Sequence, residues 1–147
     1  MSKMVKILHI EDNLVEVNLV KEAFEEARIN RELSVTRDGE EAIRYLYKKN
    51  EFCNASRPDI ILLDLNLPKK NGFEVLAVIK GDAKLKSIPV FIFTGSESKN
   101  DIFKAYQLHA NGYIRKPNNF SDYVIFFSKL VDFWGLTIVP PEMDSLS

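Results

Sequence analysis

The sequence has little of what builds a cysteine- or histidine-based metal site. Its 147 residues include one cysteine, Cys53, and two histidines, His9 and His109. A single cysteine excludes an intramolecular disulfide, and the histidines fall in different predicted elements, so they do not form a metal-binding pair. We therefore expect neither a disulfide framework nor a zinc cluster.

The sequence also lacks an excess of one charge and long apolar runs. Twenty Lys and Arg residues face 21 Asp and Glu residues, and the basic residues occur in isolated pairs, which argues against a nucleic-acid surface. The apolar stretch before Glu11 spans only residues 5–10, too short for a signal peptide, and no other run approaches a membrane span. We expect a cytoplasmic protein without nucleic-acid or membrane partners.

The pattern that is present alternates two kinds of segment. Short β-branched or aromatic runs are separated by longer stretches with helical spacing, as in β-α-β units. These runs cover residues 5–10, 33–36, 59–64, 88–94 and 112–115. Three of them are almost continuously apolar, which is typical of strands covered on both faces. The sequence predicts an α/β fold, a five-stranded parallel sheet with helices on both faces.

Segments between the strands complete this picture. Residues 14–28 carry apolar side chains at steps of three and four, which predicts a helix, and a second helix is expected to begin at Asp38. Residues 48–58 are polar and break the helical period, which indicates a surface loop. We expect one domain over residues 4–134, followed by a tail, 135–147, that contains two prolines and no periodicity.

Polar side chains mark the ends of four predicted strands. Glu11 and Asp12 follow the first, Asp64 ends the third, Thr94 ends the fourth, and Lys116 follows the fifth. Because parallel sheets bind ligands at the carboxyl ends of their strands, we expect these five residues to share one rim.

Their chemistry suits a phosphate site with a metal. Carboxylates that meet at one rim repel each other, and a hard cation such as Mg²⁺ removes the conflict. Lys116 and Thr94 suit phosphoryl oxygens, and Asp64 is the candidate nucleophile because carboxylates form aspartyl phosphates. Each residue alone has an ordinary structural explanation, such as a helix cap for the acidic pair, so the combination carries the prediction.

Four motifs resemble the receiver domain of two-component response regulators. They are ILHIEDN (7–13), DIILLDLNLPKKNG (59–72), the threonine of FIFTGSE (91–97) and YIRKP (113–117). The order and spacing of the motifs match that family over residues 4–134. The resemblance implies the CheY-like form of the flavodoxin-like fold.

The resemblance also implies a role for each residue of the acidic group. Asp64 would accept the phosphoryl group. Mg²⁺ would be bound by Asp12, Asp64 and the backbone carbonyl of Asn66, and Glu11 would reach the metal through water.

A second group of residues would respond to phosphorylation of Asp64. Thr94 and Lys116 would hold the phosphoryl oxygens, and Tyr113 would turn inward when Thr94 moves. Pro117 fits the family's cis Lys-Pro bond.

The implied function is that of a single-domain response regulator phosphorylated on Asp64 by a histidine kinase. It would catalyse its own phosphoryl acceptance and autodephosphorylation without being a turnover enzyme, and would signal by changing its surface. SIPVFIFTGSE (87–97) and DFWGLTIVPP (132–141) resemble the stand-alone receivers that partner phytochrome-type histidine kinases.

Two alternatives stay open. A degenerate receiver would bind partners without phosphorylation, although the intact residue set argues against it. A Mg²⁺-dependent aspartyl-phosphate hydrolase would use Asp64 as its nucleophile, but Asn66 stands where such a motif has its second acid, and the sequence has no cap insertion.

The last predicted helix carries two adjacent apolar stripes. One contains Phe120, Val124, Phe127, Val131 and Trp134, and the other contains Tyr123, Phe126, Leu130 and Phe133. One stripe suffices to face a sheet, so the second is covered either by a loop or the tail, or by a partner. We expect a homodimer through this helix, with the fifth strand and fourth helix.

Overall fold

A computed structural model describes residues 4–137, with side chains as far as Phe133. Its parallel sheet has the order β2-β1-β3-β4-β5. The strands are β1 (Val5–Ile10), β2 (Arg31–Thr36), β3 (Ile60–Leu63), β4 (Val90–Thr94) and β5 (Gly112–Arg115). The predicted fold class, a five-stranded parallel sheet of the CheY-like type, is confirmed.

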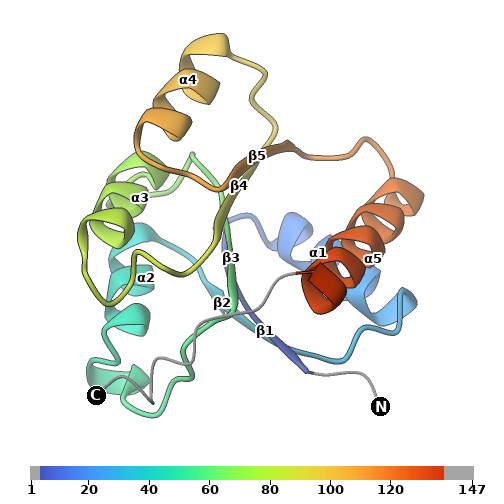
Figure 1. Cartoon of the computed structure of the whole chain (residues 1–147), viewed down its shortest axis with the longest axis horizontal. Coiled ribbons are helices and arrows are strands. Elements are labelled where there is room, and N and C mark those ends of the chain that lie inside the picture. Colours follow the sequence, from blue (N-terminus) through green and yellow to red (C-terminus); the bar gives the residue numbers. More distant parts are fainter. Residues whose placement is uncertain (1–3, 138–147) are drawn as a thin grey trace.

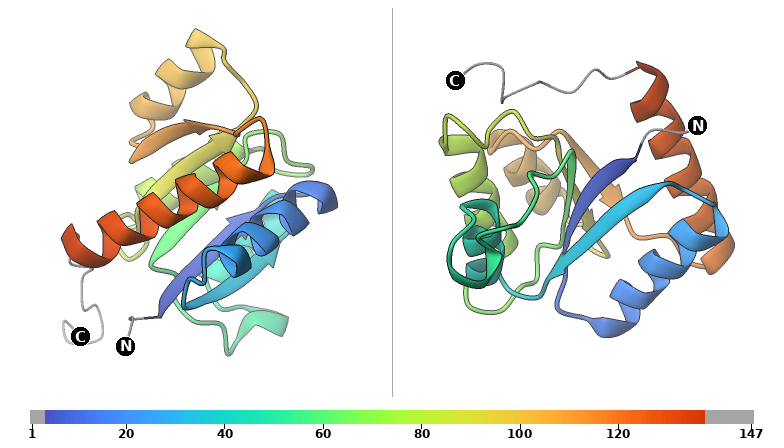
Figure 2. Two further views of the ribbon diagram at one scale, coloured as in Figure 1. Left: turned by 90° about the vertical axis from the view of Figure 1, so that its right-hand side faces the viewer. Right: turned by 90° about the horizontal axis from the view of Figure 1, so that it is seen from below.

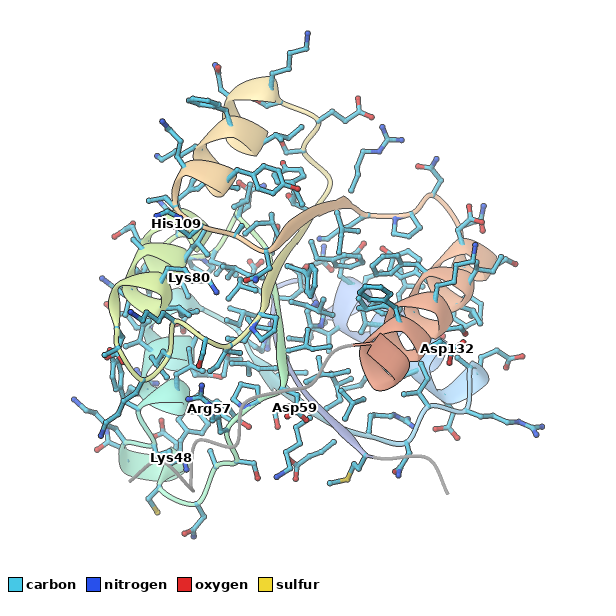
Figure 3. All side chains as sticks on the ribbon, viewed as in Figure 1. Lys48, Arg57, Asp59, Lys80, His109 and Asp132 are labelled. Carbon is cyan, nitrogen blue, oxygen red and sulfur yellow. The ribbon has the colours of Figure 1, made fainter. Side chains whose placement is uncertain are left out.

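Helices cover both faces of this sheet (Figure 1). They are α1 (Leu14–Glu26), α2 (Gly39–Leu46), the short 3₁₀ helix η1 (Asn50–Phe52), α3 (Gly72–Gly81), α4 (Lys99–Gln107) and α5 (Phe120–Thr137). In Figure 1, α1 and α5 lie on one side of the sheet, and α2, α3 and α4 lie on the other. Figure 3 shows the same division, with Asp132 of α5 across the sheet from Lys48 and Lys80.

Two apolar clusters fill the space between the sheet and its helices. Successive side chains of a strand point to opposite faces, so Leu8 and Ile10 pack with α2 and α3, whereas Val5 and Ile7 pack with α1 and α5. Each fully buried side chain of this kind stabilises the fold by about 1.5–3 kcal/mol. The central strand β3 is buried along its whole length, as its continuous apolar run predicts.

Helix caps follow closely on the strand ends. Asn13 accepts hydrogen bonds from the first backbone N–H groups of α1, Asp38 caps α2, and Ser98 caps α4. At α3, Asn71 and Glu74 form a reciprocal capping box. These caps fix where each helix begins, and thereby hold the strand-end residues between sheet and helix.

Two segments differ from the expectation. β2 begins at Arg31, earlier than the predicted run, because it pairs with β1 from Val5 onward. The predicted surface loop at 48–58 contains η1, and its Phe52 ring packs 5.3 Å from the Tyr45 ring against the core. Phe52 therefore contributes to the core from a segment whose overall composition is polar.

Most of the second stripe of α5 packs against the protein itself, whereas Phe133 in that stripe is 56% exposed. The homodimer through this helix stays a prediction. Tyr123 and Phe127 are buried, and the second-stripe residues Phe126 and Leu130 are partly buried in the same cluster. The reason is that α5 lies beside α1 as well as on the sheet, so two surfaces face it (Figure 2). Trp134 lies outside the described side chains, and the tail from residue 138 lies outside the described residues.

β5 forms one edge of the sheet, and a helix side chain occupies part of that edge. The backbone N–H of Tyr113 donates to the hydroxyl oxygen of Tyr106 in α4 at 3.1 Å. None of the helices within residues 4–137 is long and apolar enough to cross a membrane.

Candidate functional site

Three carboxylates meet at the carboxyl ends of the central strands. Glu11 and Asp12 follow β1, Asp64 follows β3, and the two strands are neighbours in register. Ligand oxygens of the three side chains lie within 4.8 Å of one another. Glu11 and Asp64 are buried, so little water is available to screen their repulsion.

Lys116, which follows the edge strand β5, brings a positive charge to this cluster. Its backbone N–H donates to the Thr94 carbonyl at 2.8 Å, which continues the β4–β5 pairing by one residue. Its Nζ lies 2.8 Å from Glu11 Oε1 and 3.7 Å from Asp64 Oδ2. The rim predicted from the strand ends therefore brings the acids and the lysine together.

The expected cis bond between Lys116 and Pro117 is wrong for this structure, because every peptide bond described in residues 4–137 is trans. The trans form is the lower in energy for most X-Pro bonds. Lys116 still reaches Glu11, so the direction of its side chain does not depend on a cis bond.

Burial and charge shift the pKa values of this pair. Burial, with a smaller contribution from the neighbouring Asp64 carboxylate, raises the pKa of Glu11 to about 7, although the Lys116 hydrogen bond opposes the change. Burial lowers the pKa of Lys116, but its hydrogen bond to Glu11 and the charge of Asp64 outweigh burial and leave that pKa above its usual value. Lys116 therefore stays positively charged at neutral pH.

Thr94 and Tyr113 meet at the loop between β4 and α4. Thr94 is fully buried, and its Oγ1 accepts a hydrogen bond from the Ser96 backbone N–H at 3.4 Å. The Tyr113 hydroxyl donates to the Ser96 carbonyl at 3.0 Å, and Ser96 Oγ donates to Asp101 Oδ2 in α4 at 2.7 Å. One loop residue therefore connects the threonine, the tyrosine and α4.

Comparisons with known proteins agree with this geometry. A model of the response regulator receiver domain matches residues 7–125. Response regulator Rcp1 of Synechocystis sp. is 42% identical over 135 residues, which make up 92% of each chain. This chain belongs to the response regulator receiver family.

Two solved structures of related receivers superpose closely. The Mn²⁺-bound form of Rcp1 has a TM-score of 0.84 at 41% identity and covers 93% of this chain and 99% of that one. The phosphorylated cyanobacterial phytochrome response regulator RcpA has a TM-score of 0.82 at 44% identity and covers 93% and 97%. The fold of this receiver thus has counterparts among response regulators.

The loop after Asp64 packs tightly against the start of α3. The N–H of Asn66, which is exposed, points to Asp64 Oδ1 at 3.5 Å, and the N–H of Gly72 donates to the Leu65 carbonyl at 2.9 Å. A Cβ added at Gly72 would lie 2.6 Å from the Leu65 Cα and closer still to the Asp64 carbonyl oxygen. Glycine is required there because the loop and α3 touch backbone to backbone.

His9 lies beneath the acidic cluster in β1. Its ring is buried, and neither ring nitrogen has a hydrogen-bond partner among the described residues. Burial lowers the pKa of His9 to about 3, and the charge of Lys116 adds to that effect. The ring is therefore a neutral core side chain.

Three residues near the site were missed by sequence reasoning. Glu16 Oε2 lies 3.9 Å from Lys116 Nζ and accepts a hydrogen bond from the Tyr123 hydroxyl at 2.7 Å. Arg37 donates to the Asp12 carbonyl at 3.1 Å. The position of Glu16, one helical turn after Asp12, was a signal for the first of them. Tyr123 was assigned only to an apolar stripe, and a hydrogen bond from its hydroxyl was not considered.

The acidic cluster of this receiver is a site that can hold a divalent cation. Glu11, Asp12 and Asp64 each offer a carboxylate oxygen, and the three oxygens are close enough to share one ion. Hard divalent cations prefer such oxygen ligands. The charge of Asp64 contributes to the raised pKa of Glu11, and a cation would relieve this repulsion between neighbouring carboxylates.

Proposed function

We propose that Asp64 is the phosphoacceptor of this receiver and that a phosphohistidine of a histidine kinase is its donor. The supporting observation is that Asp64, 6% exposed, lies beside two further acids and 3.7 Å from Lys116. A carboxylate oxygen attacks phosphorus, the P–N bond breaks, and its electron pair passes to the imidazole nitrogen, which takes up a proton.

The cation proposed for the acidic cluster is Mg²⁺, which Asp12, Asp64 and the backbone carbonyl of Asn66 would hold directly and Glu11 would reach through water. When bound, it supplies charge neutralisation for the transferring group. Lys116 supplies a second positive charge at the same oxygens. Phosphoryl transfer has little covalent chemistry for a protein to perform, so these charges and their placement account for the catalysis.

The proposed signal passes through Thr94 and Tyr113. A phosphoryl oxygen on Asp64 attracts the Thr94 hydroxyl, whose Oγ1 accepts the Ser96 N–H in the present state. Movement of Thr94 changes the Ser96 hydrogen bonds to Tyr113 and Asp101, which carries the change to β5 and α4. The output is then an altered α4–β5–α5 surface.

Labelling by a small phosphoryl donor tests the acceptor. With acetyl phosphate and Mg²⁺, Asp64→Asn should not be labelled, because the amide is a poor nucleophile. Asp59→Asn is the matched control, since Asp59 lies at the opposite end of β3 (Figure 3) and its carboxylate accepts the Lys6 N–H at 2.9 Å. Labelling of Asp64→Asn at the wild-type level would reject the assignment.

The same preparation separates the two alternatives. A degenerate receiver would show no labelling and no chemical-shift change with beryllofluoride, which imitates a bound phosphoryl group. A hydrolase would turn over free phosphate monoesters, whereas the proposed receiver consumes one donor for each cycle of acceptance and autodephosphorylation.

The proposed kinase is of the phytochrome type. The support is similarity to RcpA, which is described as a phytochrome response regulator and is 44% identical to this receiver. Transfer rates from a phytochrome-type kinase and from a kinase with another sensor, measured at equal concentrations, test this partnership. Equal rates would remove the support.

A homodimer through α5 is proposed as well. Ile125 is 51% exposed and Phe133 is 56% exposed, and their spacing of two turns puts them on one face of α5. A second copy presents the same face, so two-fold pairing would bury both. Ile125→Lys should lower the hydrodynamic radius at high concentration, while Val15→Lys, at an exposed position of α1, should not. A monomeric wild type with and without phosphoryl donor would contradict the dimer.

A further inference from the structure

Lys116 is surrounded by three carboxylates, only two of which belong to the acidic cluster. Glu11 lies 2.8 Å and Asp64 3.7 Å from Lys116 Nζ, and both are candidate metal ligands. A bound cation therefore competes with Lys116 for these two side chains. Glu16, 3.9 Å from the same nitrogen, lies outside the cluster and stays available to Lys116.

The carboxylate of Glu16 is itself fixed in place from another helix. The Tyr123 hydroxyl in α5 donates to Glu16 Oε2 at 2.7 Å, and this is the oxygen that faces Lys116. The Tyr123 ring is only 3% exposed and packs edge-on against Phe93 at 5.9 Å. Core packing thus fixes the Tyr123 ring, and its hydroxyl fixes the Glu16 carboxylate beside the site. The two residues meet where α1 and α5 lie side by side (Figure 2).

We propose that Glu16 is a positioning residue for phosphoryl transfer, and that Tyr123 holds it so that Lys116 stays beside Asp64. The proposal rests on the proposed function of Asp64 and deepens it. Glu11 and Asp64 are engaged when the site is loaded, and Glu16 is then the carboxylate that limits the range of Lys116. Because charge stabilisation depends on placement, a lysine without this tether spends less time at the transferring oxygens.

The proposal connects the packing of α5 with the reactivity of Asp64. Glu16 and Tyr123 are 107 residues apart in the sequence and meet in an environment that is only partly accessible to water. A change in α5 that displaces the Tyr123 ring would release Glu16, and with it Lys116. Partners that bind α5 would in this way alter the rate of phosphorylation as well as read its outcome.

Initial labelling rates at varied acetyl phosphate concentration, with saturating Mg²⁺, test the proposal. Glu16→Gln keeps an acceptor for Tyr123 but removes the charge, and should lower the maximal rate about 10-fold because Lys116 is misplaced. The donor concentration at half-maximal rate should not change. Tyr123→Phe keeps the ring and should lower the maximal rate about 3-fold, as expected for loss of one hydrogen bond.

Two control variants carry the same kinds of substitution, tyrosine to phenylalanine and glutamate to glutamine, at positions away from Lys116. Tyr45→Phe removes the hydroxyl of another largely buried tyrosine, which donates to Ser34 Oγ at 2.9 Å. Glu25→Gln removes another α1 glutamate, which pairs with Arg31 at 2.8 Å. Both should be labelled at the wild-type rate, and urea unfolding of every variant establishes that each is folded.

The double variant decides between a chain of contacts and two separate effects. Tyr123 acts through Glu16, so Glu16→Gln combined with Tyr123→Phe should be no slower than Glu16→Gln alone. A double variant slowed by the product of the two single losses would overturn the proposal. So would an unchanged rate in Glu16→Gln or an equal loss in Tyr45→Phe. Labelling of Asp64→Asn, measured alongside, would instead overturn the proposed function.

Discussion

Lys116 Nζ lies 2.8 Å from Glu11 Oε1, although β3 and β4 separate their strands in the sheet. The pair spans the rim above Asp64, and Glu11 is almost fully buried. A buried ion pair contributes little net stability by itself, but removing one partner leaves an expensive uncompensated charge. Lys116 and a bound cation therefore neutralise the negative charge of the same carboxylates, Glu11 and Asp64.

Lys116→Met should destabilise the metal-free protein and make it more responsive to metal. Without the ammonium group, the buried carboxylates repel each other, and we expect the free energy of unfolding to fall by about 3 kcal/mol. Mg²⁺ should then raise that free energy more in the variant than in the wild type. Urea unfolding with and without Mg²⁺ measures both effects. Lys69→Met, which breaks an exposed pair with Asp38, should cost less than about 1 kcal/mol, and an equal response to Mg²⁺ would contradict the prediction.

Tyr113→Phe should loosen the loop between β4 and α4. The variant loses the hydrogen bond to the Ser96 carbonyl, which is worth about 1 kcal/mol. Amide hydrogen exchange at residues 95–98 should become faster, while labelling of Asp64 continues. Tyr47→Phe, whose hydroxyl donates to Asp82 on the surface, should leave exchange in this loop unchanged. Unaltered exchange in Tyr113→Phe would show that the hydroxyl does not restrain the loop.

Gly72→Ala should be far more damaging than Gly81→Ala, although both residues belong to α3. The new Cβ at Gly72 would meet the backbone of Asp64 and Leu65, and relieving this overlap should cost about 1–3 kcal/mol. Nothing lies within 4 Å of a Cβ at Gly81, so alanine there should be neutral or slightly stabilising. Thermal unfolding compares the two, and similar losses would argue against close backbone packing at Gly72.

His9→Leu should make the protein less sensitive to acid. The pKa of His9 is about 3 in the fold and about 6.5 when unfolded, so between these values the unfolded chain binds the extra proton. The free energy of unfolding of the wild type should therefore fall as the pH drops below 6.5, with His9 contributing roughly 1 kcal/mol of loss between pH 7 and pH 5.5.

Urea unfolding at the two pH values isolates that contribution as the difference between the wild type and His9→Leu. His109→Asn removes the exposed histidine at the end of α4 and should retain the wild-type dependence on pH. The same loss in His9→Leu as in the wild type would show that another group controls the acid response.

Local sequence pattern was enough to predict the sheet and its rim, because each depends on short-range order. Continuous apolar runs identify buried strands, and parallel topology brings their ends to one edge, so Asp64 and Lys116 could be placed together before any coordinates were known. The proposed roles of Asn66 and Tyr113 came from the resemblance to receivers, because no spacing rule supplies them, and they stay predictions.

What the sequence did not reveal depends on contacts between distant elements. Glu16 and Tyr123 lie on separate amphipathic helices, and nothing in either helix indicates which residue of the other it will face. The wide apolar arc on α5 was predicted, but the sequence did not show that α1 lies beside it. The isomer of the Lys116–Pro117 bond likewise depends on the surrounding fold rather than on the two residues.

The hydroxyl of Tyr106 has a consequence for how copies of this protein meet. An open edge strand is a template on which further chains add strands, and repeated addition leads to fibrous aggregates. Tyr106 already accepts the Tyr113 N–H, so an incoming strand would first have to displace an α4 side chain. This contact therefore makes strand addition at Tyr113 less favourable while the Tyr106 side chain stays in place.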